Sequence, residues 1–243
     1  MLFMKFALPL LLSILFTSVL YAQKAPNIQS QSIWAKQVKI DGKLDDWGKE
    51  MAAYNKENNL WYSMSNDDKF LYLAVKKDKF PGKAYARGGI KLFISSKETK
   101  STAGLPAVTF PVPIIDGKPV PKTEWNEIDV RDIAGITDTL ISIYNEQRIQ
   151  VAWKLEDKDD GPIYTYELAI PLKLLGINQG QTIYYNMLLR GSGGKALSPA
   201  EAAMMANPSP ELNPGFSKEQ LLGMIDRTIW SEFWGSYKLA AKP

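Results

Sequence analysis

The segment that decides the fold is Lys69-Phe70-Leu71-Tyr72-Leu73-Ala74-Val75, which follows the turn-forming Asn66-Asp67-Asp68. Leu71, Leu73 and Val75 alternate with aromatic and small residues, so both sides of an extended chain carry apolar side chains. A strand that is covered on both faces belongs in the interior of a layered structure. The segment therefore predicts a central strand in a sheet.

Period-two alternation recurs in short runs on either side of this segment. Ile149, Val151 and Trp153 alternate with more polar residues, which predicts a half-buried strand. Further strands are expected at residues 34–40, 60–65, 89–95, 107–112, 140–145, 163–170, 182–189 and 235–240. Pro111 and Pro113 cannot donate hydrogen bonds to a sheet, which places the 107–112 run at an edge or a bulge.

Helical signals are few and lie late in the chain. Ser198-Pro199-Ala200-Glu201 has the pattern of a capping box, and Ser217 with Gln220 repeats it. Pro171 to Gly176 predicts a single helical turn that ends at glycine. Residues 191–214 form a long excursion between the last two strands. Together these patterns predict an all-β, antiparallel β-sandwich with short helical insertions near the C-terminus.

The chain contains no cysteine and no histidine among its 243 residues. This excludes catalytic triads with His, cysteine nucleophiles, iron–sulfur clusters and zinc sites built on thiolate or imidazole. The charge is nearly balanced, with 29 basic and 26 acidic side chains. We therefore expect no nucleic-acid partner.

The first 22 residues have the pattern of a secretory signal peptide. Lys5 supplies the basic start, Leu8 to Leu20 the apolar stretch, and Leu20-Tyr21-Ala22 a cleavage site before Gln23. The apolar stretch is too short to span a bilayer comfortably, so we expect cleavage and no stable membrane span afterwards. The remaining chain, residues 23–243, is expected to be one domain that is secreted or periplasmic.

Five segments in order carry a resemblance to a known family. They are Val38 to Trp47, Asn66 to Val75, Ile90 to Ile94, Tyr166 to Ile177 and Phe233 to Leu239. In this order and spacing they resemble the family 9 carbohydrate-binding module and its relatives of the DOMON-like, jelly-roll sandwich class. The resemblance covers nearly all of residues 38–239.

The resemblance implies a carbohydrate ligand held between two aromatic rings at one end of the sandwich. Tyr85 stands where the family has its first ring, and Trp230 stands roughly where it has the second. Arg190 ends the strand that contributes polar contacts in the family. Other members of this wide group bind haem, but this chain has no His to serve as an axial ligand.

The chain also departs from the family pattern. Ala86-Arg87-Gly88-Gly89 replaces the acidic and amide residues expected after the first ring, and Leu188-Leu189 replaces polar residues before Arg190. An alternative hypothesis is therefore a cell-envelope structural or interaction protein that keeps the sandwich without a sugar site. Such a protein would have envelope protein partners.

Two further residue types are candidates for the sugar site. Arg87 and Arg190 each carry a fork of donors that suits sugar hydroxyls or the carboxylate of an acidic sugar, or else forms a surface ion pair. Trp125 lies in the polar segment Lys122 to Glu127, where periodicity does not explain it. Ligand contact and packing of a lid are equal interpretations for this ring.

The acidic residues do not predict catalysis. Glu124, Glu127, Asp129 and Asp132 are numerous in one segment, but their spacing is that of a solvated loop rather than of a glycosidase pair. The turn from Asp157 to Gly161 is expected to reverse a hairpin, with a structural calcium ion as the alternative. We expect a non-enzymatic protein without a cofactor.

Overall fold

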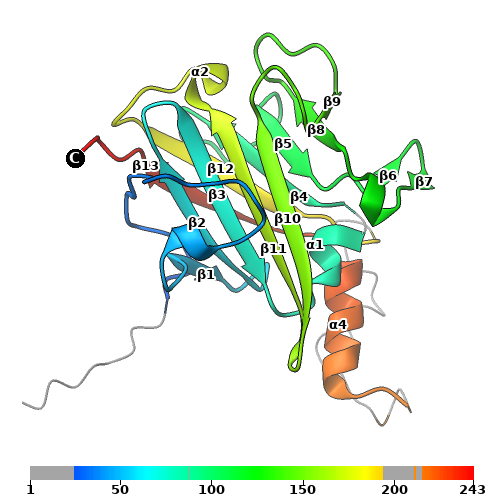
Figure 1. Cartoon of the computed structure of the whole chain (residues 1–243). Helices are drawn as coiled ribbons and strands as arrows, with labels where there is room; N and C mark the ends of the chain where they lie inside the picture. Colours follow the sequence, from blue (N-terminus) through cyan, green and yellow to red (C-terminus); the bar gives the residue numbers. More distant parts are fainter. Residues whose placement is uncertain (1–24, 87, 194–210, 212–214) are drawn as a thin grey trace, which may run out of the picture.

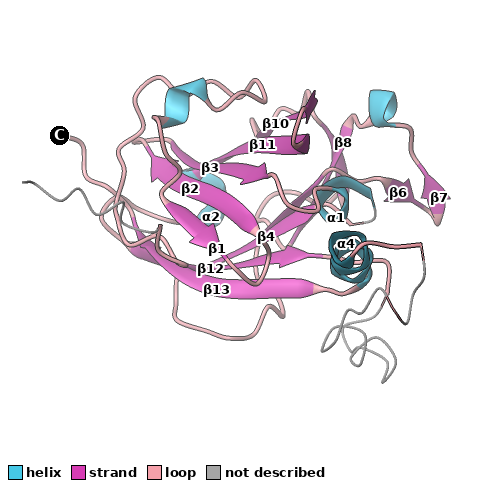
Figure 2. Cartoon of the chain, turned by 90° about the horizontal axis from the view of Figure 1, so that it is seen from below, coloured by secondary structure: helices cyan, strands magenta, loops and turns pink. Residues whose placement is uncertain are grey.

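The computed structural model describes residues 25–86, 88–193, 211 and 215–243, and its main feature is a pair of antiparallel sheets packed face to face (Figures 1 and 2). The predicted signal peptide, residues 1–22, and the predicted capping box at Ser198 lie outside the described residues. The all-β sandwich expected from the sequence is confirmed.

The first sheet has five strands in the order β1-β2-β3-β11-β10. They are β1 (Ala53–Asn55), β2 (Leu60–Asn66), β3 (Phe70–Lys77), β11 (Gly161–Pro171) and β10 (Gln150–Lys158). The predicted central strand is β3, which pairs with β2 on one side and β11 on the other. The half-buried strand predicted from Ile149 to Trp153 is β10, at the sheet edge.

The second sheet has six strands in the order β13-β12-β4-β5-β8-β9. They are β13 (Ser231–Lys238), β12 (Thr182–Leu189), β4 (Ile90–Ser95), β5 (Ala107–Phe110), β8 (Glu127–Arg131) and β9 (Leu140–Ser142). A small hairpin of β6 (Ile114–Ile115) and β7 (Lys118–Pro119) follows β5. The proline-containing run was expected at an edge or a bulge, and the edge position was wrong. β5 pairs on both sides and ends at Phe110, so Pro111 and Pro113 lie beyond it.

The helices of the described residues are short, and η1 (Asp45–Trp47) lies over the outer face of the five-stranded sheet. The others are α1 (Gly82–Ala86), η2 (Lys122–Glu124), α2 (Leu172–Leu175) and α4 (Lys218–Thr228). The predicted capping box of α4 is confirmed, because Ser217 accepts from the Gln220 amide and Gln220 accepts from the Ser217 amide. In the described part of the chain, no helix is long and apolar enough to cross a membrane.

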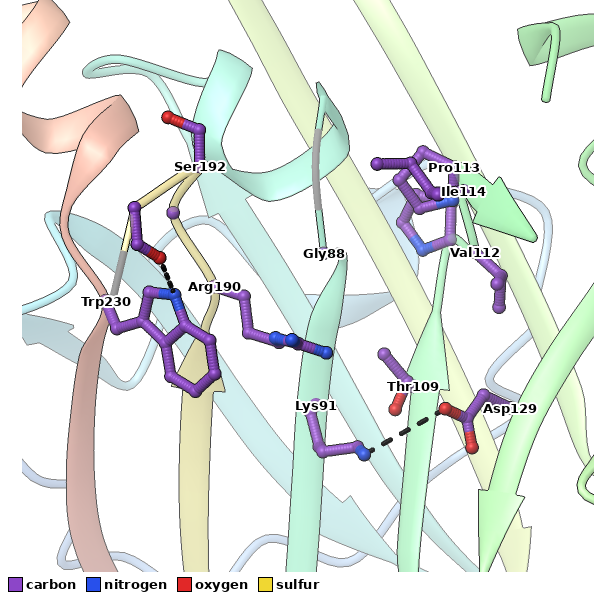
Figure 3. Close-up of a pocket in the computed structure, with 13 residues that line it drawn as sticks. Gly88, Lys91, Thr109, Val112, Pro113, Ile114, Asp129, Arg190, Ser192 and Trp230 are labelled. Atoms are coloured by element: carbon purple, nitrogen blue, oxygen red, sulfur yellow. Dashed lines mark hydrogen bonds and ion pairs between the residues drawn. The ribbon is translucent and has the colours of Figure 1, made fainter. Parts of the chain in front are cut away.

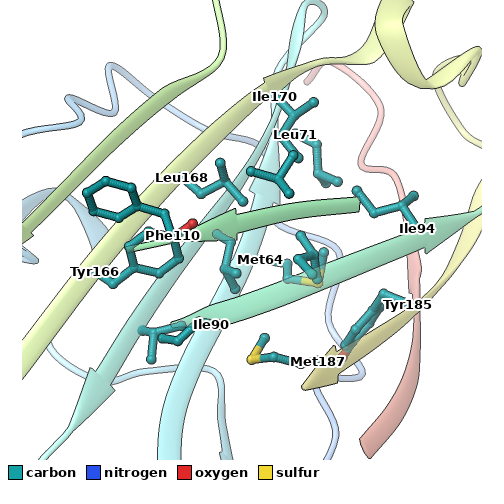
Figure 4. Close-up of a cluster of buried hydrophobic side chains, with 14 of the residues drawn as sticks. Met64, Leu71, Ile90, Ile94, Phe110, Tyr166, Leu168, Ile170, Tyr185 and Met187 are labelled. Atoms are coloured by element: carbon teal, nitrogen blue, oxygen red, sulfur yellow. The ribbon is translucent and has the colours of Figure 1, made fainter. Parts of the chain in front are cut away.

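The core lies between the two sheets and is built from the inward side chains of both (Figure 4). Ile90, Leu92 and Ile94 of β4 face Leu71, Leu73 and their neighbours in the first sheet. Two tyrosines connect the sheets through their hydroxyls, with 2.9 Å between the oxygens of Tyr62 and Tyr185. Burial of alternate residues on each strand therefore fixes which side chains point outward.

The N-terminal segment covers the outer face of the five-stranded sheet. The buried carboxylate of Glu167 accepts hydrogen bonds from the amides of Asp41 and Gly42 and from Trp47 Nε1. The strand expected at residues 34–40 was wrong, because only Trp34 forms a bridge, with Asn66. The segment is held instead by packing against the sheet and by the hydrogen bonds to Glu167. Alternation along the sequence does not reveal a segment that covers a sheet in this way.

A buried ion cluster ties α4 to the sandwich end. Asp226 of α4 lies 3.7 Å from Lys77 Nζ and 3.8 Å from Lys83 Nζ, and all three side chains are nearly inaccessible. Lys77 also donates to the carbonyl of Asn58 at 2.8 Å, and Lys83 donates to Ser231 at 2.8 Å. Burial lowers the pKa of Lys77 to about 8, against the attraction of Asp226.

This pKa predicts a pH-dependent stability that the variant Lys77→Met removes. Between pH 8 and 10.5 the folded protein has lost the Lys77 proton while the unfolded chain keeps it, so stability rises with pH in this window. We expect the wild type to gain up to about 3 kcal/mol relative to Lys77→Met. Urea unfolding of both proteins from pH 7 to 10.5 measures the difference. A constant difference across this range contradicts the prediction.

Candidate functional site

The site is built on the outward face of the six-stranded sheet. Lys91, Thr109 and Asp129 each lie between two inward apolar residues of their strands, so they point away from the core. The strand register places them in one row, with Lys91 opposite Thr109 and Thr109 opposite Asp129. Three neighbouring strands, all within residues 90–131, thus bring an amine, a hydroxyl and a carboxylate together.

A cavity of about 320 Å³ lies over this row, between Trp230 on one side and Pro113 and Ile114 on the other (Figure 3). The polar ends of Arg190, Lys91 and Asp129 line the floor between these walls. The lining residues are Gly88, Lys91, Thr109, Pro111, Val112, Pro113, Ile114, Asp129, Arg190, Gly191, Ser192, Gly193 and Trp230.

Arg190 and Trp230 form a stacked pair at the cavity wall. The guanidinium carbon of Arg190 lies 4.5 Å from the centre of the Trp230 ring. Trp230 Nε1 donates to the carbonyl oxygen of Gly193 at 2.7 Å, which fixes the ring orientation. The Gly193 amide in turn donates to the Thr228 carbonyl at the end of α4. Helix α4 therefore supports the wall.

Glycines permit the close approach of backbones around Arg190. A side chain on Gly88 would meet the Cβ of Arg190 at well under 3.0 Å. Gly89 has φ +64°, and a side chain there would meet the Pro111 carbonyl oxygen. The departure from the family pattern at Gly88 and Gly89 is thus a packing requirement of this site.

The charges at the cavity floor are unequally paired. Arg131 Nε donates to Asp129 Oδ1 at 2.7 Å, whereas Lys91 Nζ lies 3.9 Å from Asp129 Oδ2, beyond hydrogen-bond distance. Burial lowers the pKa of Lys91, Asp129 acts in the opposite direction, and the positive charges of Arg131 and Arg190 lower it further. Lys91 is therefore a cation that lacks close compensation.

Thr109 adds an unsatisfied polar group to the floor. Its side chain is 5% exposed, and its Oγ1 has no hydrogen-bond partner among the described residues. Buried hydroxyls usually have a partner, because an unpaired one is destabilising.

The structure brings together two of the five residues predicted for the site, Arg190 and Trp230. Tyr85 of α1 packs instead against the core and Tyr164, with Lys122 over its ring. Trp125 is 6% exposed, packs against Trp153 with ring centres 4.8 Å apart and tilted planes, and donates to the Val120 carbonyl, so it packs in the core. Neither Tyr85 nor Trp125 lines the cavity. The predicted contact by Arg87 lies outside the described residues.

Sequence reasoning missed Lys91 and Thr109, and considered Asp129 only as part of an acidic loop. The available signal was their position between apolar neighbours on predicted strands. Alternation shows that such residues point outward, but it does not show which residues of different strands become neighbours.

Among the described residues, no group of three or more acidic residues is placed to hold a metal ion. Asp159 and Asp160 form the turn between β10 and β11, where Lys158 pairs with Gly161. The hairpin interpretation of this acidic turn is confirmed.

No protein-family model matches the chain, and no curated protein matches it in sequence. One solved structure to which it is similar is a family 9 carbohydrate-binding module from Caldicellulosiruptor kristjanssonii in complex with glucose. The sequence identity is 11%, the match covers 88% of this chain and 96% of that chain, and the TM-score is 0.41. The sandwich fold is shown by the two antiparallel sheets of this chain.

The packing of Gly88 predicts a large effect of one added methyl group. Gly88→Ala forces a clash with Arg190, and we expect it to lower the free energy of unfolding by about 1–3 kcal/mol. Gly82→Ala is the matched control, because a Cβ there meets Arg227 at an ordinary 3.4 Å. Urea unfolding measures both variants. Equal stabilities of the two would contradict the described contact.

Proposed function

We propose that the chain is an exported, non-catalytic carbohydrate-binding protein whose ligand occupies the cavity beside Trp230. The observation that carries the proposal is the convergence of the Trp230–Arg190 stack with Lys91, Thr109 and Asp129 around one open cavity. Saccharide sites need this combination, because sugar rings have apolar faces and hydroxyl edges. An aromatic wall serves the faces, and charged or hydroxyl side chains serve the edges.

The size of the cavity favours a small ligand. A volume of about 320 Å³ lies at the lower end of the range for small-molecule sites. The Trp230 side closes one end, and the Pro113–Ile114 side closes the other (Figure 3). This supports binding of a single sugar unit or the end of a glycan rather than of a long internal segment.

The lining residues support a binding role. Among the described residues around the cavity, Asp129 is the sole carboxylate, and it is held by Arg131. Hydrolysis of a glycosidic bond needs two carboxylates at a defined separation. Export is proposed from the signal-peptide pattern at residues 1–22 alone. The protein then captures a sugar or glycan end for uptake or breakdown by other proteins.

Truncation of the aromatic wall tests the proposal. Trp230→Ala removes the ring that positions Arg190, and we expect the affinity for the best saccharide of a glycan-array screen to fall on the order of tenfold to a hundredfold. Titration calorimetry measures the affinities.

Tyr144→Ala is the control, because this aromatic residue is 87% exposed and does not line the cavity. The control should bind as the wild type does. Absence of binding to every neutral and acidic saccharide, or undiminished binding by Trp230→Ala, would refute the proposal.

A further inference from the structure

We propose that the Trp230 cavity prefers saccharides that carry a carboxylate, with Arg190 and Lys91 as the two cations that bind it. The inference rests on the proposed function and specifies its substrate class. A neutral hexose and its uronic acid share the same ring, and they differ in that the uronic acid carries a carboxylate where the neutral sugar carries a hydroxymethyl group.

The balance of charge at the cavity favours an anion. Lys91 and Arg190 both line it, and Asp129 is the one acidic side chain that does so among the described residues. The charge of Asp129 is already opposed by Arg131, which donates to both of its oxygens at 2.7 and 3.5 Å. Glu232 lies on the same face of the sheet, opposite Leu188, but is not part of the cavity lining. A bound carboxylate would therefore compensate two cations.

The orientation of Arg190 suits a carboxylate. Its guanidinium carbon lies 4.5 Å from the centre of the Trp230 ring, and its side chain runs along the cavity floor (Figure 3). A guanidinium held beside the ring in this way keeps N–H groups at its edges, where they bind both oxygens of a carboxylate. The hydrogen bond from Trp230 to Gly193 holds the stack in place before the ligand arrives.

Lys91 provides the second cation from the neighbouring strand. Burial lowers the pKa of Lys91, the charge of Asp129 acts against this, and the charges of Arg131 and Arg190 lower it further. Asp129 Oδ2 lies 3.9 Å from Lys91 Nζ, which is an ion pair without a hydrogen bond. An anion between Lys91 and Arg190 would relieve the repulsion between these two cations.

The test compares matched pairs of sugars. Glucose with glucuronic acid and galactose with galacturonic acid, each as the monosaccharide and the terminal unit of an oligosaccharide, are titrated into the purified protein by calorimetry. We expect the acidic member of at least one pair to bind tenfold or more tightly than the neutral member. We also expect this preference to shrink between 50 and 500 mM NaCl, because ionic contacts are screened by salt.

Three substitutions assign the preference to its residues. Arg190→Gln and Lys91→Gln should each reduce uronate binding at least tenfold and reduce neutral-sugar binding by a smaller factor, so that the ratio of the two affinities falls. Arg190→Lys keeps the charge but loses the fork, so its affinity should lie between those of the wild type and Arg190→Gln. Lys118→Gln, an exposed cation outside the cavity, should bind as the wild type does. Thermal unfolding confirms that each variant is folded.

The possible failures are distinguishable. Equal binding of neutral and acidic sugars, or a preference that survives Arg190→Gln and Lys91→Gln, overturns this inference and leaves the proposed function standing. Absence of binding to both kinds of sugar overturns the proposed function and this inference together. Acetate or sulfate that competes as strongly as the uronate also overturns it, because the cavity would then be a general anion site.

Discussion

The packing of two sheets against each other decides which side chains form the floor of the cavity beside Trp230. Every second residue of β4, β5 and β8 is buried in the core, so the residues between them face outward. The register of these strands then places Lys91, Thr109 and Asp129 in one row. The set of side chains on the cavity floor is thus a consequence of core burial and of strand pairing. A shift of the pairing register by one residue in any of the three strands would change it.

Helix α4 connects the stability of the sandwich end to the geometry of the cavity. Its inner side carries Asp226 into contact with two buried lysines, and its last turn accepts the backbone of residues 192–193. Breaking a buried ion cluster of this kind is costly, because charges remain without compensation. The Arg190–Trp230 stack therefore rests on a rigid support rather than on the loop alone.

Much of the fold could be predicted from the sequence, whereas only part of the site could. Alternation revealed β3, β10 and β12, and the capping box revealed α4, because these signals are local. Strand β8 was assigned to a polar loop, since it contains only Ile128 and Val130 as apolar positions. Arg190 and Trp230 were found through the family resemblance, but the pairing of Lys91 with Thr109 and Asp129 depends on contacts between distant strands.

The central claim, that a saccharide binds beside Trp230, is tested most directly by NMR titration of the indole Nε1–H resonances. Trp230→Phe assigns the relevant peak, and Trp153, which packs against the core, serves as the internal reference. We expect a saturable shift of the Trp230 resonance, because its Nε1–H bonds to Gly193 at the cavity edge, with little change at Trp153. Saturable saccharide binding that leaves the Trp230 resonance unmoved would contradict the account.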